Sequence, residues 1–319
     1  MERNPLKRLV ADRIGVMLVT VLFVSMIVFA TTEMLPGDVA EIVLGQNATP
    51  EAVKGLRQAM NLDQPAVLRY LSWLKNLMVG DLGKSLVNNI PISDMLGVRL
   101  GNSLLLAGFT ALVSVPIALL LGTTAAIWRG TPYDYIVGAL TISVVSVPEF
   151  LVATVSVLVF SVHLHWLPAL SSLNNIHSIT DLLRVFAMPV MVLSFVISAQ
   201  MIRMTRAVVI EALRSPYIEM ATLKGVSPTG IVLKHALPNT VGPVANAVAL
   251  SLSYLLGGVI IVETIFNYPG VAKLMVDAVA TRDMPLIQAC AMIFSFSYLM
   301  LVTIADILAI LFNPRLRRS

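Results

Sequence analysis

The sequence predicts an all-α protein that crosses a lipid bilayer six times. Its 319 residues are 57% hydrophobic and 13% charged, whereas soluble domains carry about a quarter charged residues. Six apolar runs reach the roughly 20 helical residues that a hydrocarbon core of about 30 Å requires. These runs cover residues 14–32, 102–128, 135–162, 185–202, 241–262 and 285–311.

Positive charge predicts that both chain ends lie in the cytoplasm, because short cytoplasmic loops are enriched in Lys and Arg. The basic residues of the predicted inner side flank the apolar runs: Arg3, Lys7, Arg8, Arg13, Arg129, the group from Arg203 to Lys234, Arg315, Arg317 and Arg318. The short outer loops hold Arg184, Lys273 and Arg282. The net charge of +4 is thereby explained by membrane flanks, and no nucleic-acid partner is expected.

The first apolar run separates three predicted regions. Residues 1–32 form a cytoplasmic N-terminus and the first span. This span is interpreted as retained, because it is longer than a typical signal-peptide core and lacks a small-x-small cleavage site. Residues 33–100 form an extracytoplasmic lobe, and residues 101–319 form a core with the other five spans.

The outer lobe is predicted to be helical. Thr49, Pro50 and Glu51 have the order of an N-cap, an N1 proline and a first-turn acid, so a helix begins there and runs to about residue 60. A second helix begins near Pro65 and carries an apolar stripe at helical spacing: Leu68, Leu71, Leu74 and Met78. A mere spacer, the alternative, would not need such a stripe.

The lobe also contains GDLGKS, at residues 80–85, which resembles a nucleotide-binding P-loop. That motif requires a glycine five positions before its Gly-Lys-Ser, where the backbone wraps around phosphates. Met78 occupies that position. The segment is therefore not interpreted as a nucleotide site.

A polar segment interrupts the apolar sequence between the fourth and fifth runs. Ser215-Pro216 and Ser227-Pro228 are two N-cap and N1 pairs. Gly225 stands where a helix C-terminus favours a residue that tolerates positive φ, and Pro238 is expected to end the second helix. Two short helices, residues 216–224 and 228–237, are predicted on the cytoplasmic side. They form either a docking site for a partner or an amphipathic loop on the bilayer.

This segment resembles the EAA loop of ABC-transporter permeases. The matching positions are Glu219, Ala221, Gly225, Ile231, Leu237 and Pro238, and Met220 departs from the usual second residue. The resemblance implies that residues 206–240 form a coupling loop whose first helix, beginning at Pro216 and Tyr217, sits in a cleft of an ATP-binding subunit. The glutamate and glycine would shape this joint.

Other segments resemble one subfamily, the importers of peptides, opines and nickel. They are LPGDVA (35–40), LDQPAVLRYLSWL (62–74), GDLGKS (80–85), SVPEF (146–150), VETIFNYPG (262–270), RDMP (282–285) and NPRLRR (313–318). Val39, Ala272 and Asn313 replace a usual proline, glycine and aspartate. The match spans essentially the whole chain in the right order.

The resemblance implies a non-catalytic subunit in a bacterial inner membrane that binds no cofactor or metal itself. Its expected partners are the lipid bilayer, a second homologous permease, two ATP-binding subunits that use ATP and Mg, and an extracytoplasmic solute-binding protein. Di- or oligopeptides are the expected substrates, with opine, nickel chelate and short oligosaccharide as alternatives. An autonomous secondary transporter or channel is the rival class, and a membrane enzyme is disfavoured because no H-E-x-x-H pair or carboxylate pair lies at helix depth.

Two further sites are candidates for the translocation path or its gate. Glu149 follows Pro148 inside an apolar run, and an intramembrane carboxylate usually faces a cavity or a partner. Its alternative role is a carboxylate satisfied near a helix break. The second site lies at the outer end of the fifth run and comprises Glu263, Asn267, Pro269 and Gly270. These residues form either a turn next to the gate or a simple turn that ends the helix.

Three histidines, His163, His165 and His177, suggest a metal site. Histidines two positions apart point differently on a helix, and a strand would need further ligands. Together with Trp166 the first two are interpreted instead as part of an outer interfacial belt.

Overall fold

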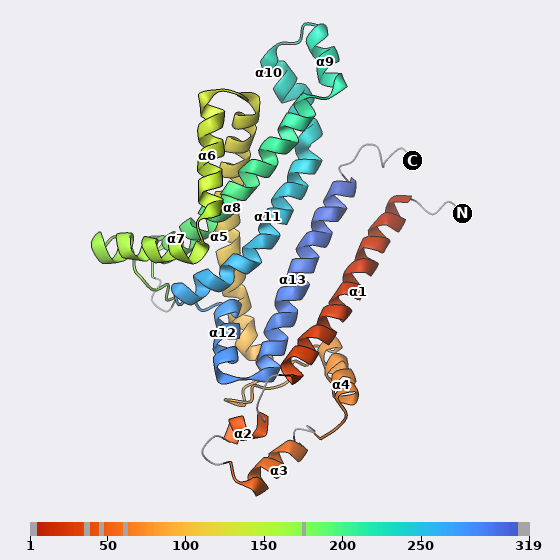
Figure 1. The fold of residues 1–319 in the computed structure, drawn as a ribbon, viewed down its shortest axis with the longest axis vertical. Helices are drawn as coiled ribbons and strands as arrows, with labels where there is room; N and C mark the ends of the chain where they lie inside the picture. Colours follow the sequence, from red (N-terminus) through yellow and green to blue (C-terminus); the bar gives the residue numbers. More distant parts are fainter. Residues whose placement is uncertain (1–4, 35–38, 45–47, 60–62, 174–176, 312–319) are drawn as a thin grey trace. The chain divides into compact units, whose positions relative to one another are not determined.

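The computed structural model describes residues 5–34, 39–44, 48–59, 63–173 and 177–311 (Figure 1). These residues form helices and connecting turns, with no strand beyond an isolated bridge between Lys84 and Pro91. The all-α prediction is confirmed. Two sequence signatures, residues 35–40 and 313–318, lie wholly or mostly outside the described residues.

The chain forms two compact units. Unit 1 comprises Met1–Met17, Leu104–Tyr268 and Tyr298–Ser319, and unit 2 comprises Leu18–Ser103 and Pro269–Ser297. Three of the four boundaries fall inside helices, namely α1 (Pro5–Glu33), α5 (Ile92–Ile127) and α13 (Met284–Leu311), and the fourth lies between Tyr268 and Pro269. The regions predicted around residues 1–32, 33–100 and 101–319 refer to sides of the membrane, and they stay predictions.

Within the described residues, five helical stretches are long and apolar enough to cross a membrane: Leu9–Glu33, Ile92–Ile127, Ile179–Leu213, Ile231–Ile265 and Met284–Ile310. They correspond to five of the six predicted runs. The other run, residues 135–162, is not one straight helix. It consists of α6 (Pro132–Ser146), followed by α7 (Glu149–Ser156) and the π-helical segment η2 (Val157–His163), with a bend of 94° between them.

Proline explains the bend. The ring of Pro148 disfavours helical geometry at the residue before it, and Val147 is extended, with φ −90° and ψ 125°. Pro148 also lacks the N–H that would continue the α6 hydrogen bonds. The chain therefore restarts as α7 in a new direction, which Figure 1 shows as a helix turned away from the axis of α6.

The core of unit 1 is built around α8 (Ile179–Leu213). This helix packs against α6, α7 and α11 (Leu237–Ile265), and it buries large side chains such as Met188, Leu193 and Met201. It also lies close to α5. A Cβ built on Gly122 would lie 2.8 Å from both the Ile202 carbonyl oxygen and the Thr205 Cβ, a close approach that small residues allow between membrane helices.

The expectation that Pro238 ends a helix is wrong. After α9 (Pro216–Leu223), the chain forms α10 (Pro228–Gly230) and a π-helical turn, η3 (Ile231–Ala236), and then continues into α11. A π-helix bonds each N–H five residues back and widens the turn. The wider turn accommodates a proline ring and its missing N–H, so the helix passes through Pro238.

Unit 2 contains α2 (Val39–Leu44), α3 (Pro50–Ala59), α4 (Ala66–Met78) and α12 (Val271–Thr281). The predicted start of α3 is confirmed, because the Ala52 N–H donates to Thr49 Oγ1 at 3.3 Å. The core of unit 2 gathers side chains from α5, α12 and α13: Ile92, Leu96, Val271, Leu274, Ala278, Leu286, Ala289 and Cys290.

The predicted helix α4 is present, but it packs through a different face. The ring centroids of Tyr70 and Trp73 lie 5.5 and 5.9 Å from that of Phe29 in α1. The Tyr70 hydroxyl oxygen is 2.9 Å from the Ser25 hydroxyl oxygen. Three members of the predicted stripe remain 53%, 53% and 81% exposed: Leu68, Leu71 and Met78. Aromatic side chains, with their larger area and polar tips, outcompete the aliphatic stripe for this contact.

The GDLGKS segment is a structural turn. Ser85 Oγ donates a hydrogen bond to Asp283, and the Leu86 N–H donates to the same carboxylate at 3.2 Å. Both Ser85 and Asp283 are buried. Two signatures far apart in the sequence, GDLGKS and RDMP, thus meet in one polar cluster of unit 2.

Candidate functional site

The segment predicted to be a coupling loop, residues 206–240, has a well-defined local structure around α9. Ser215 occupies the N-cap position of α9, with φ −75° and ψ 149°, and Pro216 follows it as predicted. At the other end of α9, the Gly225 N–H donates to the Thr222 carbonyl at 2.9 Å, and the Val226 N–H donates to the Ala221 carbonyl at 3.2 Å. This bond pair is a Schellman motif. Gly225 has φ +77°, so the predicted positive φ is confirmed.

One face of α9 is apolar and exposed. The helix buries Ile218 and Ala221. Its remaining large apolar side chains, at three-residue spacing, are 41%, 55% and 76% exposed: Tyr217, Met220 and Leu223. We call these three residues the α9 face. Clustered apolar exposure of this kind marks an interaction site.

The other motif residues divide by position. Glu219 is exposed beside the α9 face, whereas Ala221 is buried beneath it. Ile231 and Leu237 are half-buried, in η3 and at the start of α11, and α9 packs against η3. The structure therefore separates the exposed α9 face from a packed base.

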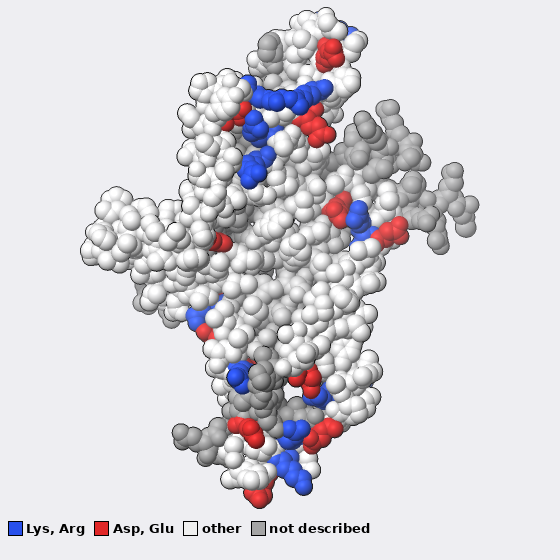
Figure 2. Space-filling view, in the orientation of Figure 1, with Lys and Arg blue, Asp and Glu red and all other residues white. Residues whose placement is uncertain are grey.

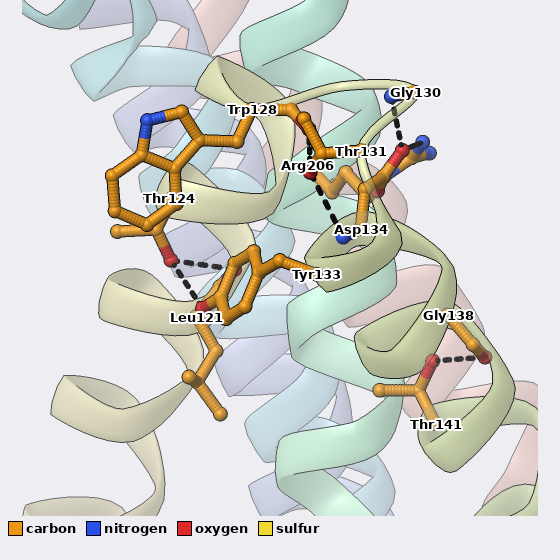
Figure 3. A network of polar contacts seen from close by, with 10 residues as sticks. All are labelled: Leu121, Thr124, Trp128, Gly130, Thr131, Tyr133, Asp134, Gly138, Thr141 and Arg206. Carbon is orange, nitrogen blue, oxygen red and sulfur yellow. Dashed lines mark hydrogen bonds and ion pairs between the residues drawn. The ribbon is translucent and has the colours of Figure 1, made fainter.

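An ion pair fixes α6 to α8 in the same unit (Figure 3). The Asp134 carboxylate accepts hydrogen bonds from Arg206 Nε at 2.6 Å and from Arg206 Nη2 at 2.8 Å. It also accepts one from the Gly130 N–H at 3.0 Å, and Thr131 Oγ1 caps α6 by accepting from the Asp134 N–H at 3.5 Å. Asp134 is buried, and bidentate charge-assisted bonds of this type are strong and directional. We call this pair the Asp134–Arg206 clamp.

Aromatic and hydroxyl side chains complete the turn between α5 and α6 (Figure 3). The Trp128 and Tyr133 rings pack edge to face with centroids 5.3 Å apart, and the Tyr133 hydroxyl is 2.8 Å from Thr124 Oγ1. Arg206 lies on α8 seven positions before Leu213, where that helix ends and leads into α9. The clamp thus joins the α5–α6 turn to the helix that carries the coupling loop.

Sequence reasoning missed this clamp. A Thr-Pro pair followed by an acid, at residues 131–134, is a recognisable helix start. It signals where α6 begins, but it does not identify the Arg206 partner 72 positions away.

Basic side chains surround this end of unit 1. Figure 2 shows Lys and Arg gathered near the part of the unit that carries α9 and α10. The basic residues in the α5–α6 turn and at the end of α8 include Arg129, Arg203, Arg206 and Arg214. Such enrichment is typical of the cytoplasmic end of a membrane protein.

Glu149 lies in the wall of a cavity of about 380 Å³. The lining comes from four helices, α6, α7, α8 and α11: Val145, Glu149, Val196, Ile197, Gln200, Ser251, Tyr254 and Gly258. Pro148 stands at the N-cap of α7, and its bend turns Glu149 toward α11. The structure thus brings this candidate residue to a cavity rather than only to a helix break.

The other candidate site is a tightly bonded turn. Its first part, in unit 1, ends α11 as a second Schellman motif: Asn267 has φ +48°, its N–H donates to Thr264 O at 3.3 Å, and the Tyr268 N–H donates to Glu263 O at 2.9 Å. Glu263 and Tyr268 are fully buried. Burial, and then the negative charge of Glu263, raise the pKa of the Tyr268 hydroxyl well above its usual range.

The second part of this turn belongs to unit 2. The Pro269 carbonyl accepts a hydrogen bond from Asn102 Nδ2 at 2.8 Å, and Gly270 is the N-cap of α12. The Val271 N–H donates to Ser103 Oγ at 2.9 Å. This geometry describes a helix-ending turn, and a gate role for these residues stays a prediction.

The histidines do not assemble with other ligands. His163 Nδ1 lies 2.8 Å from the Leu158 carbonyl oxygen, and His165 Nδ1 lies 3.2 Å from the His163 carbonyl oxygen. Within the described ranges, no group of three or more His, Cys, Asp or Glu side chains is arranged to hold a metal ion.

Apolar helices of membrane length and an exposed loop at a basic end define a polytopic membrane subunit. Comparison with protein families agrees. Residues 118–318 match the family described as binding-protein-dependent transport system inner membrane component, and residues 6–102 match its N-terminal family. The chain belongs to this family of ABC-transporter inner-membrane permeases.

Individual relatives are similar over nearly their whole length. The glutathione transport system permease protein GsiC of Escherichia coli O6:H1 is 35% identical over 298 residues, covering 93% of this chain and 95% of the relative. The proteins of the same name from Escherichia coli K12 and Shigella flexneri serotype 5b give the same identity and coverage. The chain is thus similar over nearly its whole length to permease proteins of glutathione transport systems.

Proposed function

We propose that this permease imports glutathione or short peptides and is driven through its coupling loop by ATP-binding partner subunits. The α9 face carries this proposal, because it leaves three large apolar side chains exposed on a helix of two turns at a basic end of the unit. So short a helix is marginal alone. It is held here by its buried side chains and the Schellman motif, as a docking element requires.

The partners follow from the class of transporter. A second homologous permease would complete the translocation path, two ATP-binding subunits would hydrolyse ATP with Mg, and an extracytoplasmic binding protein would deliver the substrate. The chain itself would bind no cofactor. The names of the relatives support glutathione as one substrate, and di- or oligopeptides share its amide and ammonium groups.

The clamp supplies a physical route for the coupling. Force applied to α9 reaches α8 through the chain, and the Asp134–Arg206 clamp joins α8 to the α5–α6 turn. We propose that Glu149 lines the translocation path, because it lies in the wall of a cavity, and that Pro148 positions it there through the helix break. Glu263, Asn267, Pro269 and Gly270 are proposed as the fixed turn beside the gate.

Disulfide cross-linking tests the docking proposal. Cys290 is buried, so a cysteine at Met220 gives a defined reactive site in the complex expressed with its genomic neighbours. We expect Met220→Cys to cross-link to an ATP-binding subunit carrying a cysteine in its docking cleft. The matched control is Ser72→Cys, which is exposed on α4 and predicted to lie outside the membrane. A cross-link from Ser72→Cys, or none from Met220→Cys, would contradict the proposal.

A further inference from the structure

The cavity beside Glu149 is lined by one carboxylate and several neutral polar side chains, although it lies among apolar helices. Glu149 is the only charged residue in its lining. Three neutral polar side chains share the wall: Gln200, Ser251 and Tyr254. All four groups offer oxygen atoms that accept hydrogen bonds, and no Lys, Arg or His contributes.

The Glu149 carboxylate is held against the backbone of α11. A Cβ built on Gly258 would lie 2.6 and 2.8 Å from its two carboxylate oxygens. Such distances are too short for a side-chain carbon, so a larger residue at this position would require the carboxylate to shift. Its neighbour Gly257 has open space around it.

The carboxylate is not neutralised by the chain. Among the residues that the structure describes, none forms an ion pair or a hydrogen bond with the Glu149 side chain. The Ser251 hydroxyl already donates to the Ala247 carbonyl at 2.9 Å, which leaves its oxygen free to accept. An intramembrane carboxylate that faces a cavity and has no cationic partner in the protein is expected to bind a cation that enters the cavity.

We propose that Glu149, Gln200, Ser251 and Tyr254 form a cation-accepting subsite that holds the ammonium group of a peptide-type substrate during passage. A primary ammonium has three N–H donors, which match the carboxylate and the neutral oxygens around it. The cavity volume of about 380 Å³ lies within the range of small-molecule sites, about 300–1,000 Å³. This inference rests on the proposed function, because it names the substrate group that this path would recognise.

Charge-selective thiol modification tests the subsite in the assembled complex. The reporter is Val145→Cys, which lines the cavity without removing a polar group, in a Cys290→Ala background. The probes are a trimethylammonium-ethyl and a sulfonato-ethyl methanethiosulfonate. We expect Glu149→Gln to lower the ratio of cationic to anionic modification rates by roughly tenfold or more, the effect of a unit charge a few ångströms away in a partly desolvated site.

Two neighbouring glycines give a matched pair of variants. Gly258→Ala should lower the same ratio while Glu149 is retained, because the added methyl displaces the carboxylate. Gly257→Ala, in open space on the same turn, should leave the ratio unchanged. Equal ratios in the parent, Glu149→Gln and Gly258→Ala would overturn the proposal, as would a reporter that neither reagent reaches.

Substrate protection identifies the cation. A dipeptide with a free amino group should slow modification of Val145→Cys, whereas its N-acetylated form should not. Protection by sodium or potassium alone would overturn the assignment to a substrate ammonium. Failure of ATP-driven uptake by the parent complex would instead contradict the proposed function, since the reagent ratios are read without transport.

Discussion

At the scale of single residues, Gly225 shows how a backbone requirement fixes the shape of the turn after α9. Its φ of +77° ends α9 in a Schellman motif, and a Cβ at this position would meet no atom within 4 Å. The glycine is therefore required by conformation and not by space. The sequence alone predicted this, because a glycine between two Ser-Pro helix starts is a strong C-terminal signal.

A substitution series at Gly225 tests this role. Left-handed backbone costs a side chain about 1 kcal/mol, less for Asn and more for a β-branched residue. We expect substrate transported per ATP hydrolysed in proteoliposomes to fall in the order Gly, Asn, Ala, Val. Thr229→Ala, an exposed change in the same loop, should behave as the parent. A Gly225→Val complex with the parent's ratio would refute a shaping role for this turn.

At the scale of elements, the sequence located the long apolar helices and indicated a helix break near Pro148, but it misjudged Pro238. Pro148 lies inside an apolar run that hydropathy treats as one span, yet it breaks that run into α6 and α7. Pro238 looks like a helix stop, yet η3 lets the helix continue. Hydrophobic periodicity reports length and burial, whereas the direction of a chain after proline depends on the turns and neighbours around it.

The bend between α6 and α7 can be measured as a distance. Spin labels replacing Tyr135 and Val162, both exposed, should lie about 28 Å apart if two helical legs meet near a right angle. A straight helix of the same residues would place them about 40 Å apart. Pulsed electron resonance on the assembled complex distinguishes the two values, and a single population near the longer one would contradict the broken span.

If the Asp134–Arg206 clamp joins α6 to α8, breaking it should destabilise the subunit and reversing its charges should restore part of the stability. Asp134→Asn should destabilise the subunit by about 1–2 kcal/mol, because the buried partner loses its charge while Arg206 stays partly solvated. The charge swap, Asp134→Arg combined with Arg206→Asp, should be more stable than either of its two single changes. It should also recover part of the coupling between ATP hydrolysis and transport that each single change loses. Thermal unfolding in detergent measures the first effect. A double variant no better than either single change would argue against a specific pair.

At the scale of the whole molecule, the spans and the short helices could be predicted from local signals of charge, turns and helix length, and the family from the motif segments that resemble it. The clamp and the Glu149 cavity could not be predicted. The clamp pairs residues 72 positions apart, and the cavity draws its lining from four helices. The sequence marked Glu149 as an intramembrane charge, but the partners of Glu149 and Asp134 are set only by tertiary packing.

The most direct measurement of the central claim is uptake into proteoliposomes of defined composition. The chain would be reconstituted with its second permease, with or without the ATP-binding subunits, and supplied with binding protein, labelled glutathione or a dipeptide, and ATP. We predict uptake that requires the ATP-binding subunits and ATP hydrolysis. Uptake at the same rate by this chain alone, without ATP, would contradict the claim and identify an autonomous transporter.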